Sequence, residues 1–148
     1  MNLEEFLALF GIQKKVAAEL VGRSYFSFKD KSLLSKRPLF IGECIAHLRG
    51  PVLIPSIGFL QEIGRLAKHR VVVNPEGEWL FICGRDVFGK SIVKHTDPKI
   101  GDRVVILNRH SECIGYGDVV GPMDGKVVVK RLFDIGDLLR RERKSRSF

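Results

Sequence analysis

The feature that most constrains the fold of this chain is a series of short apolar runs after Lys68. These runs are rich in β-branched residues and are separated by Gly, Pro, Asp or Asn; they read HRVVVNP, SIVKH, DRVVIL, ECIGYGDVV and KVVVKRL. β-Branched residues favour strands, and the separating residues favour turns. Short strands at such even spacing predict a small β barrel or sandwich in the second half of the chain.

The first half of the chain alternates between helix and strand patterns. Asn2 is a good N-cap for a helix that we expect to continue past Gly11 and to stop at Gly22. Its apolar residues recur at helical spacing: Leu3, Phe6, Leu7, Phe10, Ile12, Val16, Ala17 and Leu20. The segments SYFSF, PLFIGECIAHL and GPVLIP predict strands, and the polar segment KDKSLLSKR predicts a connection between the first two.

A second helix is predicted to begin at Ser56, with small residues on its apolar face that allow close packing on a sheet. That face consists of Ile57, Leu60, Gly64 and Ala67. The predicted class is therefore α+β, with an N-terminal α/β domain over residues 1–68 and a β-barrel domain over residues 69–148. The first domain should hold a mixed or antiparallel sheet. Because no low-complexity linker separates the two, we expect them to touch.

The charge of the chain favours a polyanionic partner. Lys and Arg total 25 against 17 acidic residues, which gives a net charge of +8. From Lys126 to Phe148 there are eight basic and three acidic residues, so this segment alone carries +5. The surplus is therefore concentrated near the carboxyl-terminal end.

The last residues predict a short helix with a basic end. Asp134 is a plausible N-cap and Asp137 lies in the first turn, so the helix should bury Ile135, Leu138 and Leu139. Five cations follow within seven residues: Arg140, Arg141, Arg143, Lys144 and Arg146. One or two cations would satisfy the helix dipole, so five indicate contact with a polyanion.

The segment GRDVFGKS, Gly84 to Ser91, matches the phosphate-loop pattern of nucleotide-binding proteins at every fixed position. A phosphate loop joins a buried strand to a helix. Here Asn74 and Pro75 predict a short helix before the segment, and β-branched residues follow it. Two other interpretations stay open: Gly84 ends a helix and Gly89 permits a close approach, or a loop carrying Arg85 and Lys90 holds an RNA backbone.

Other residues have side chains of the types used in metal binding, catalysis and base stacking. Cys44-x-x-His47 and His110-x-x-Cys113 contain zinc-ligand types, but residues three apart on a strand face opposite sides, so we expect no metal and no cofactor. No nucleophile, base and acid combination is evident. We expect the cysteines to be reduced, the glycines of CIGYG to be architectural and Trp79 and Phe81 to lie in the core, and we leave open whether Phe88 stacks on bases.

No apolar run approaches the roughly 20 residues that span a bilayer, and no secretory leader opens the sequence. We therefore expect a cytoplasmic protein without a membrane partner.

From His69 to Phe148 the chain resembles a PUA domain, a small RNA-binding pseudobarrel. The resemblance rests on GRDV, GKSI, CIGYG and FDIGD in that order. With DIGDLLRRE, PLFIGECIAHL and FLQEIGRLAKHRVVVNPEGEWLFICGRDVF included, the whole chain resembles archaeal homologues of the Nip-seven ribosome-biogenesis factors, in which an α/β pre-PUA domain precedes the PUA domain.

The resemblance implies a non-enzymatic RNA-binding protein in ribosomal RNA processing and large-subunit biogenesis. Single-stranded RNA rich in U, or in A and U, is the implied ligand, with contacts from Arg140, Arg141 and Lys144, and with Arg143 and Arg146 nearby. The implied glycine loop runs from Arg85 to Ser91, with Gly89 essential. An exosome subunit or another assembly factor is the implied protein partner. The alternatives are a small nucleotide-binding protein using Gly84–Ser91 and an RNA-binding subunit of an RNA-modifying enzyme.

Overall fold

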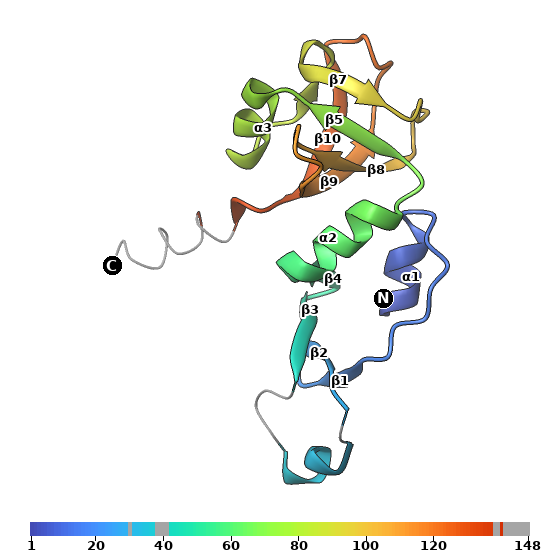
Figure 1. Ribbon diagram of the computed structural model, residues 1–148, viewed down its shortest axis with the longest axis vertical. Coiled ribbons are helices and arrows are strands. Elements are labelled where there is room, and N and C mark those ends of the chain that lie inside the picture. Colours follow the sequence, from blue (N-terminus) through green and yellow to red (C-terminus); the bar gives the residue numbers. More distant parts are fainter. Residues whose placement is uncertain (30, 38–41, 138–139, 141–148) are drawn as a thin grey trace.

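The described part of the protein contains two sheets joined by a helix (Figure 1). The computed structural model describes residues 1–29, 31–37, 42–137 and 140. In the described part, one sheet has the strand order β1-β2-β3-β4 and the other has the order β6-β10-β9-β8-β5-β7. Figure 1 shows the four-stranded sheet at the lower end, the six-stranded sheet at the upper end and α2 between them.

The first helix, α1, spans Leu3–Ala8 and is capped as predicted. The Asn2 side chain accepts a hydrogen bond from the backbone N–H of Glu5 at 2.8 Å, and the Glu5 carboxylate accepts one from the Asn2 backbone at 2.9 Å. The predicted continuation past Gly11 is wrong. Gly11 has a φ of 73°, which turns the chain out of the helix, and Leu20 lies in strand β1.

The four-stranded sheet is antiparallel throughout. Its strands are β1, Glu19–Val21; β2, Ser24–Ser27; β3, Glu43–Arg49; and β4, Val52–Pro55. The strands predicted in SYFSF, PLFIGECIAHL and GPVLIP are thus present where the structure describes them. The polar connection contains a 3-10 helix over Lys31–Lys36 that the sequence did not predict.

Helix α2, Ile57–Leu66, packs against both sheets. Ser56 caps it, as predicted, by accepting a hydrogen bond from Phe59 N at 3.2 Å. The buried face differs in part from the predicted one, because Ile57 is 56% exposed and Phe59 and Ile63 are buried. Gly64 does lie on the buried face: a Cβ added there would come within 2.7 Å of Cys113 Cβ in β9, so the helix and the barrel meet at this glycine.

The six-stranded sheet curves into a nearly closed barrel with mixed strand directions. Strand β5 runs parallel to β8, and the other pairs are antiparallel. Its strands are β5, Arg70–Val73; β6, Val87–Phe88; β7, Ile92–His95; β8, Arg103–Leu107; β9, Cys113–Val119; and β10, Val127–Asp134. Helix α3, Pro75–Ile82, lies between β5 and β6 in the chain. All five predicted strand runs form strands here, while the two-residue β6 was not predicted.

The glycines of CIGYG are architectural, as predicted. Gly115 has a φ of 152°, and a Cβ there would lie 2.1 Å from Phe133 O on the neighbouring strand. A Cβ on Gly117 would lie 2.3 Å from Lys130 O. Neither position leaves room for a larger residue beside β10.

The two halves share one hydrophobic core, which confirms the expected contact between them. Tyr116 of β9 packs edge-on against Phe6 and Phe10, with ring centroids 5.8 and 5.1 Å apart, and stacks on Phe133 at 5.5 Å. A second core, which includes Val71 and Phe81, lies within the barrel. The passage from the first sheet to the second falls between α2 and β5, and the division into domains at residues 68 and 69 stays a prediction.

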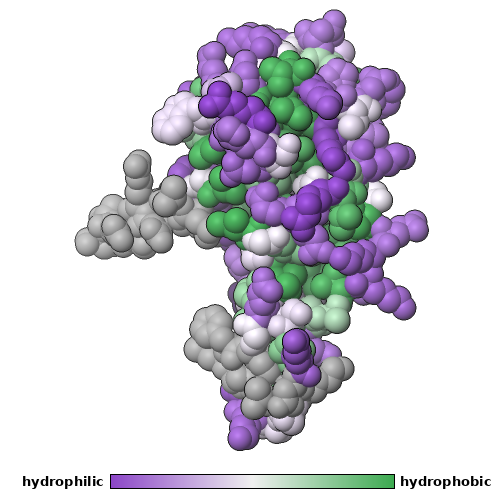
Figure 2. Space-filling model, viewed as in Figure 1, coloured by the Kyte–Doolittle hydropathy of each residue, from purple (hydrophilic) through white to green (hydrophobic). Residues whose placement is uncertain are grey.

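The surface is mainly polar on the face seen in Figure 2, with hydrophobic residues showing between hydrophilic ones. Within the described residues, none of the helices combines the length and apolar character needed to cross a membrane.

We predict that Gly64→Ala lowers the free energy of unfolding by about 1–3 kcal/mol, because its methyl group would overlap Cys113. Gly58→Ala is the matched control. Gly58 lies in the same helix and is exposed, and a Cβ added there would lie 3.7 Å from Glu43 Oε1, an ordinary contact distance. It should leave stability unchanged or raise it by up to about 1 kcal/mol. Denaturant unfolding checks both, and equal effects of the two changes would contradict the close packing at Gly64.

Candidate nucleic-acid interface

Helix α3 places the glycine-containing loop at the surface of the barrel. The predicted start and end of this helix are confirmed. Asn74 accepts a hydrogen bond from Gly77 N at 2.8 Å, Pro75 is the first helical residue, and Gly84 follows the helix with a φ of 95°. The left-handed conformation at Gly84 ends the helix and sends the chain toward β10.

The loop does not have the geometry of a phosphate loop. After Gly84 the chain pairs with β10 as strand β6, forms a single 3-10 turn at Gly89–Ser91 and continues as β7. Ser91 is only 2% exposed, so its hydroxyl is not available to a nucleotide-bound metal ion. Because a strand replaces the helix whose N-terminus would hold the phosphates, the nucleotide-binding interpretation is wrong.

Gly89 is required by protein packing. A Cβ on this residue would lie 2.3 Å from Gly125 O and 2.9 Å from Met123 O. Its N–H donates to Gly125 O at 3.1 Å, which fastens the glycine loop to the turn before β10. The close-approach interpretation therefore holds for Gly89, while its predicted contact with RNA stays a prediction.

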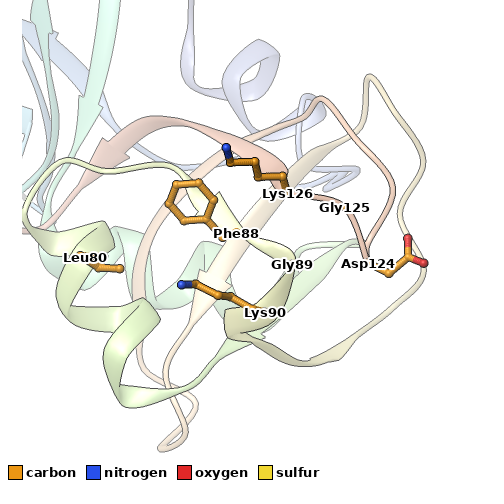
Figure 3. Close-up of a pocket in the computed structure, with 7 residues that line it drawn as sticks. All are labelled: Leu80, Phe88, Gly89, Lys90, Asp124, Gly125 and Lys126. Carbon is orange, nitrogen blue, oxygen red and sulfur yellow. The ribbon is translucent and has the colours of Figure 1, made fainter.

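A cleft of about 700 Å³ lies beside this junction. Its lining residues are Leu80, Phe88, Gly89, Lys90, Asp124, Gly125 and Lys126. Figure 3 shows the Phe88 ring between the side chains of Lys90 and Lys126, with both amino groups extending toward the same side and the Asp124 carboxylate pointing away. The arrangement offers an aromatic face flanked by two positive charges.

Lys126 was not among the predicted site residues. Lys126 begins the basic carboxyl-terminal segment in the sequence, but its position next to the loop follows from the pairing of Val127 with Phe88. That pairing joins residues far apart in the chain. A two-residue strand gives no periodic signal, so the sequence alone could not place Lys126 in the cleft.

The predicted cations of the loop are both exposed. Arg85 and Lys90 lie on either side of β6 in the chain. Between them, the Asp86 carboxylate accepts a hydrogen bond from the backbone N–H of Arg131 at 2.8 Å and so holds the loop against β10.

Arg140 lies beside the same loop, which places the start of the basic carboxyl-terminal segment next to it. A Cβ on Gly84 would lie 3.5 Å from Arg140 Cζ. The other predicted cations, Arg141, Arg143, Lys144 and Arg146, lie outside the described residues, as do Leu138 and Leu139. Their predicted roles stay predictions.

Asp134 is not the helix N-cap that the sequence predicted. It is the last residue of β10 and is fully buried. Its Oδ2 accepts hydrogen bonds from Arg131 at 3.1 Å and from Arg140 at 2.7 Å. Burial and two arginine partners make this carboxylate part of an internal ion pair, because a buried charge is tolerated only when it is paired.

The remaining aromatic and cysteine candidates differ in their exposure to solvent. Phe81 is fully buried, as predicted, but Trp79 is 68% exposed, because it lies two residues from Phe81 and so points to the opposite side of α3. Cys113 is buried, Cys44 is half-buried and Cys83 is exposed. Within the described ranges no three His, Cys, Asp or Glu side chains are grouped to hold a metal ion.

The fold is that of PUA-type proteins. A conserved PUA domain protein from Thermoplasma acidophilum is similar over 95% of this chain and 91% of its own, with 18% identity and a TM-score of 0.61. A PUA domain from Aeropyrum pernix K1, solved as a tartrate complex, is similar over 62% of this chain and 57% of its own, with 17% identity and a TM-score of 0.52.

A family model identifies the chain more specifically than the fold does. Residues 69–143 match the model of the UPF0113 PUA domain, and this match covers just over half of the chain, so the chain belongs to that family. UPF0113 proteins from Archaeoglobus fulgidus and Aeropyrum pernix are 32% and 34% identical over 91 residues, which cover 57% and 59% of this chain. The aligned part spans about half of each relative, 52% and 49% respectively.

We predict that Cys83 reacts with iodoacetamide at pH 8 while Cys113 is protected. Burial raises the pKa of the Cys113 thiol to about 12, so almost none of it is thiolate at that pH. Because this pKa is raised on folding, the stabilisation by the neutral thiol is complete below about pH 9 and is lost as the pH rises toward 12. Peptide mass spectrometry follows the modification, with Cys83→Ser as the control. Modification of native Cys113 as fast as Cys83 would contradict its burial.

Proposed function

We propose that this protein binds single-stranded RNA, without catalysing a reaction, through the cleft between α3 and the turn before β10. The observation that carries the proposal is the Phe88 ring flanked by Lys90 and Lys126 in a cleft of about 700 Å³. The family adds support, because PUA domains generally bind RNA.

The chemistry of the cleft suits an RNA single strand. Ammonium groups neutralise phosphates, and an aromatic face stacks on an unpaired base. A base within a duplex has no free face, so stacking on Phe88 selects loops, bulges and single strands. The resemblance to Nip-seven factors extends the proposal to strands rich in U or in A and U.

The cations that extend this surface are Arg85 on the loop and the basic residues near the end of the chain: Arg141, Arg143, Lys144 and Arg146. The position of Arg140 beside Gly84 supports their inclusion, because the segment starts next to the loop. Gly89 contributes by holding the loop against the turn at residues 122–125.

The proposed cellular role is ribosomal RNA processing and assembly of the large ribosomal subunit in the cytoplasm of an archaeal-type cell. In this proposal residues 1–68 form a pre-PUA domain that recruits an exosome subunit or another assembly factor, and residues 69–148 form the RNA-binding domain. Crosslinking in native cells and sequencing of the attached RNA tests the role. Precursors of ribosomal RNA are expected, and a library of mature transfer RNAs would contradict it.

The phosphate contacts are tested by the salt dependence of binding to a U-rich oligoribonucleotide. Each phosphate contact on a single strand contributes about −0.7 to the slope of log K against log salt concentration. Lys90→Ala and Lys126→Ala should each flatten the slope by about 0.7 and weaken binding at low salt. Lys15→Ala removes the same charge from an exposed position in the first half and should leave the slope unchanged. Slopes equal to that of the parent in both cleft variants would refute these contacts.

The stacking contact is tested by Phe88→Leu, which keeps an apolar side chain but removes the ring. Stacking contributes about 1–3 kcal/mol per base, so affinity should fall about tenfold with the salt slope unchanged. Phe88→Tyr retains the aromatic face and should bind like the parent. Fluorescence anisotropy measures affinity, and thermal unfolding verifies that both variants are folded. Equal affinity of Phe88→Leu and the parent would show that the ring does not stack on RNA.

A further inference from the structure

The guanidinium of Arg140 occupies a socket made by four residues, Ile82, Gly84, Asp134 and Gly136. It donates to Asp134 Oδ2 at 2.7 Å and to the carbonyl oxygen of Ile82. The two glycines make room for it. A Cβ on Gly84 would lie 3.5 Å from Arg140 Cζ, and one on Gly136 would lie 3.0 Å from Arg140 Nη1 and 2.2 Å from Ile82 O.

Two independent electrostatic needs are met by this one cation. Ile82 is the last residue of α3, so its carbonyl belongs to the end of the helix that carries partial negative charge. Asp134 is a fully buried carboxylate, and such a group needs a cationic partner. Hydrogen bonding to Asp134 raises the pKa of Arg140 further above its ordinary value.

The socket also reaches the first half of the chain. Asp137 Oδ1 lies 4.0 Å from Arg140 Nη2, and Asp137 Oδ2 lies 3.8 Å from Arg49 Nη2 at the end of β3. Asp137 therefore lies between Arg140, which contacts the end of α3, and Arg49 of the four-stranded sheet.

We propose that Arg140 is a positioning residue that anchors the basic carboxyl-terminal segment beside the glycine loop and does not itself contact phosphate. This differs from the role that the sequence predicted for Arg140. Its charge is committed to Asp134 and Ile82, so the phosphate contacts come from the other cations. The positioning role rests on the proposed RNA binding. The contribution of Arg140 to stability can be measured without RNA.

The anchor is tested in the full chain by thermal unfolding of Arg140→Ala, Asp134→Asn and the double variant. Each single change should lower the Tm by about 5 °C or more. Arg140→Ala leaves the buried Asp134 with Arg131 as its remaining cationic partner and removes the donor to the Ile82 carbonyl, while Asp134→Asn removes the negative charge that both arginines share. The double variant should lose clearly less than the sum of the two. Arg140→Lys keeps the charge, but its single ammonium nitrogen cannot reproduce the forked geometry in which Nη1 donates to Ile82 and Nη2 to Asp134, so it should not restore the parent Tm. An unchanged Tm for Arg140→Ala, or strictly additive losses, would overturn the anchor.

The positioning role is tested by the salt dependence of binding to a U-rich oligoribonucleotide, at a temperature where every variant is folded. Arg140→Ala should weaken binding several-fold at each salt concentration while the slope stays within about 0.2 of the parent. Arg85→Ala is the matched control, an exposed arginine of the loop, and should flatten the slope by about 0.7 at an unchanged Tm.

A slope flattened by about 0.7 in Arg140→Ala, with full restoration of slope and affinity by Arg140→Lys, would overturn the positioning role. If the parent does not bind the oligonucleotide, the proposed function fails, and the unfolding measurements still decide whether Arg140 is an anchor.

Discussion

The pairing of β6 with β10 is the constraint on which the arrangement of the site depends. It is only two residues long on the β6 side, yet it joins the glycine loop to the strand that opens the basic part of the chain. The Gly89 hydrogen bond to Gly125 and the Asp86 contact with Arg131 fasten the same junction. Without this pairing, Phe88, Lys90 and Lys126 would not line one cleft.

Positive charge in this protein serves two purposes that composition cannot separate. Lys90 and Lys126 lie in an open cleft, where an anion can reach them. Arg131 and Arg140 share the buried carboxylate of Asp134. Stabilising a buried aspartate and neutralising a phosphate both require a cation, so the total of 25 basic residues overstates the number of cations available to RNA.

Local signals predicted the elements well, and contacts between distant residues accounted for most errors. The caps at Asn2, Ser56 and Asn74 and the strand runs depend on neighbours in the chain, so the sequence was sufficient to place them. The end of α1 depends on the left-handed turn at Gly11 and on the hydrogen bond from Lys68 N to Phe10 O, which no periodicity reveals. Lys126 and the socket of Arg140 likewise required the barrel to form.

The most direct test is photo-crosslinking of the protein to a single-stranded oligoribonucleotide that carries 4-thiouridine, with the attachment sites mapped by mass spectrometry. Crosslinks should fall on Phe88, on the flanking loop residues from Arg85 to Lys90 and on the turn that contains Lys126. They should disappear when unlabelled U-rich RNA competes. Crosslinks confined to residues 1–68, with none in the cleft, would contradict the account.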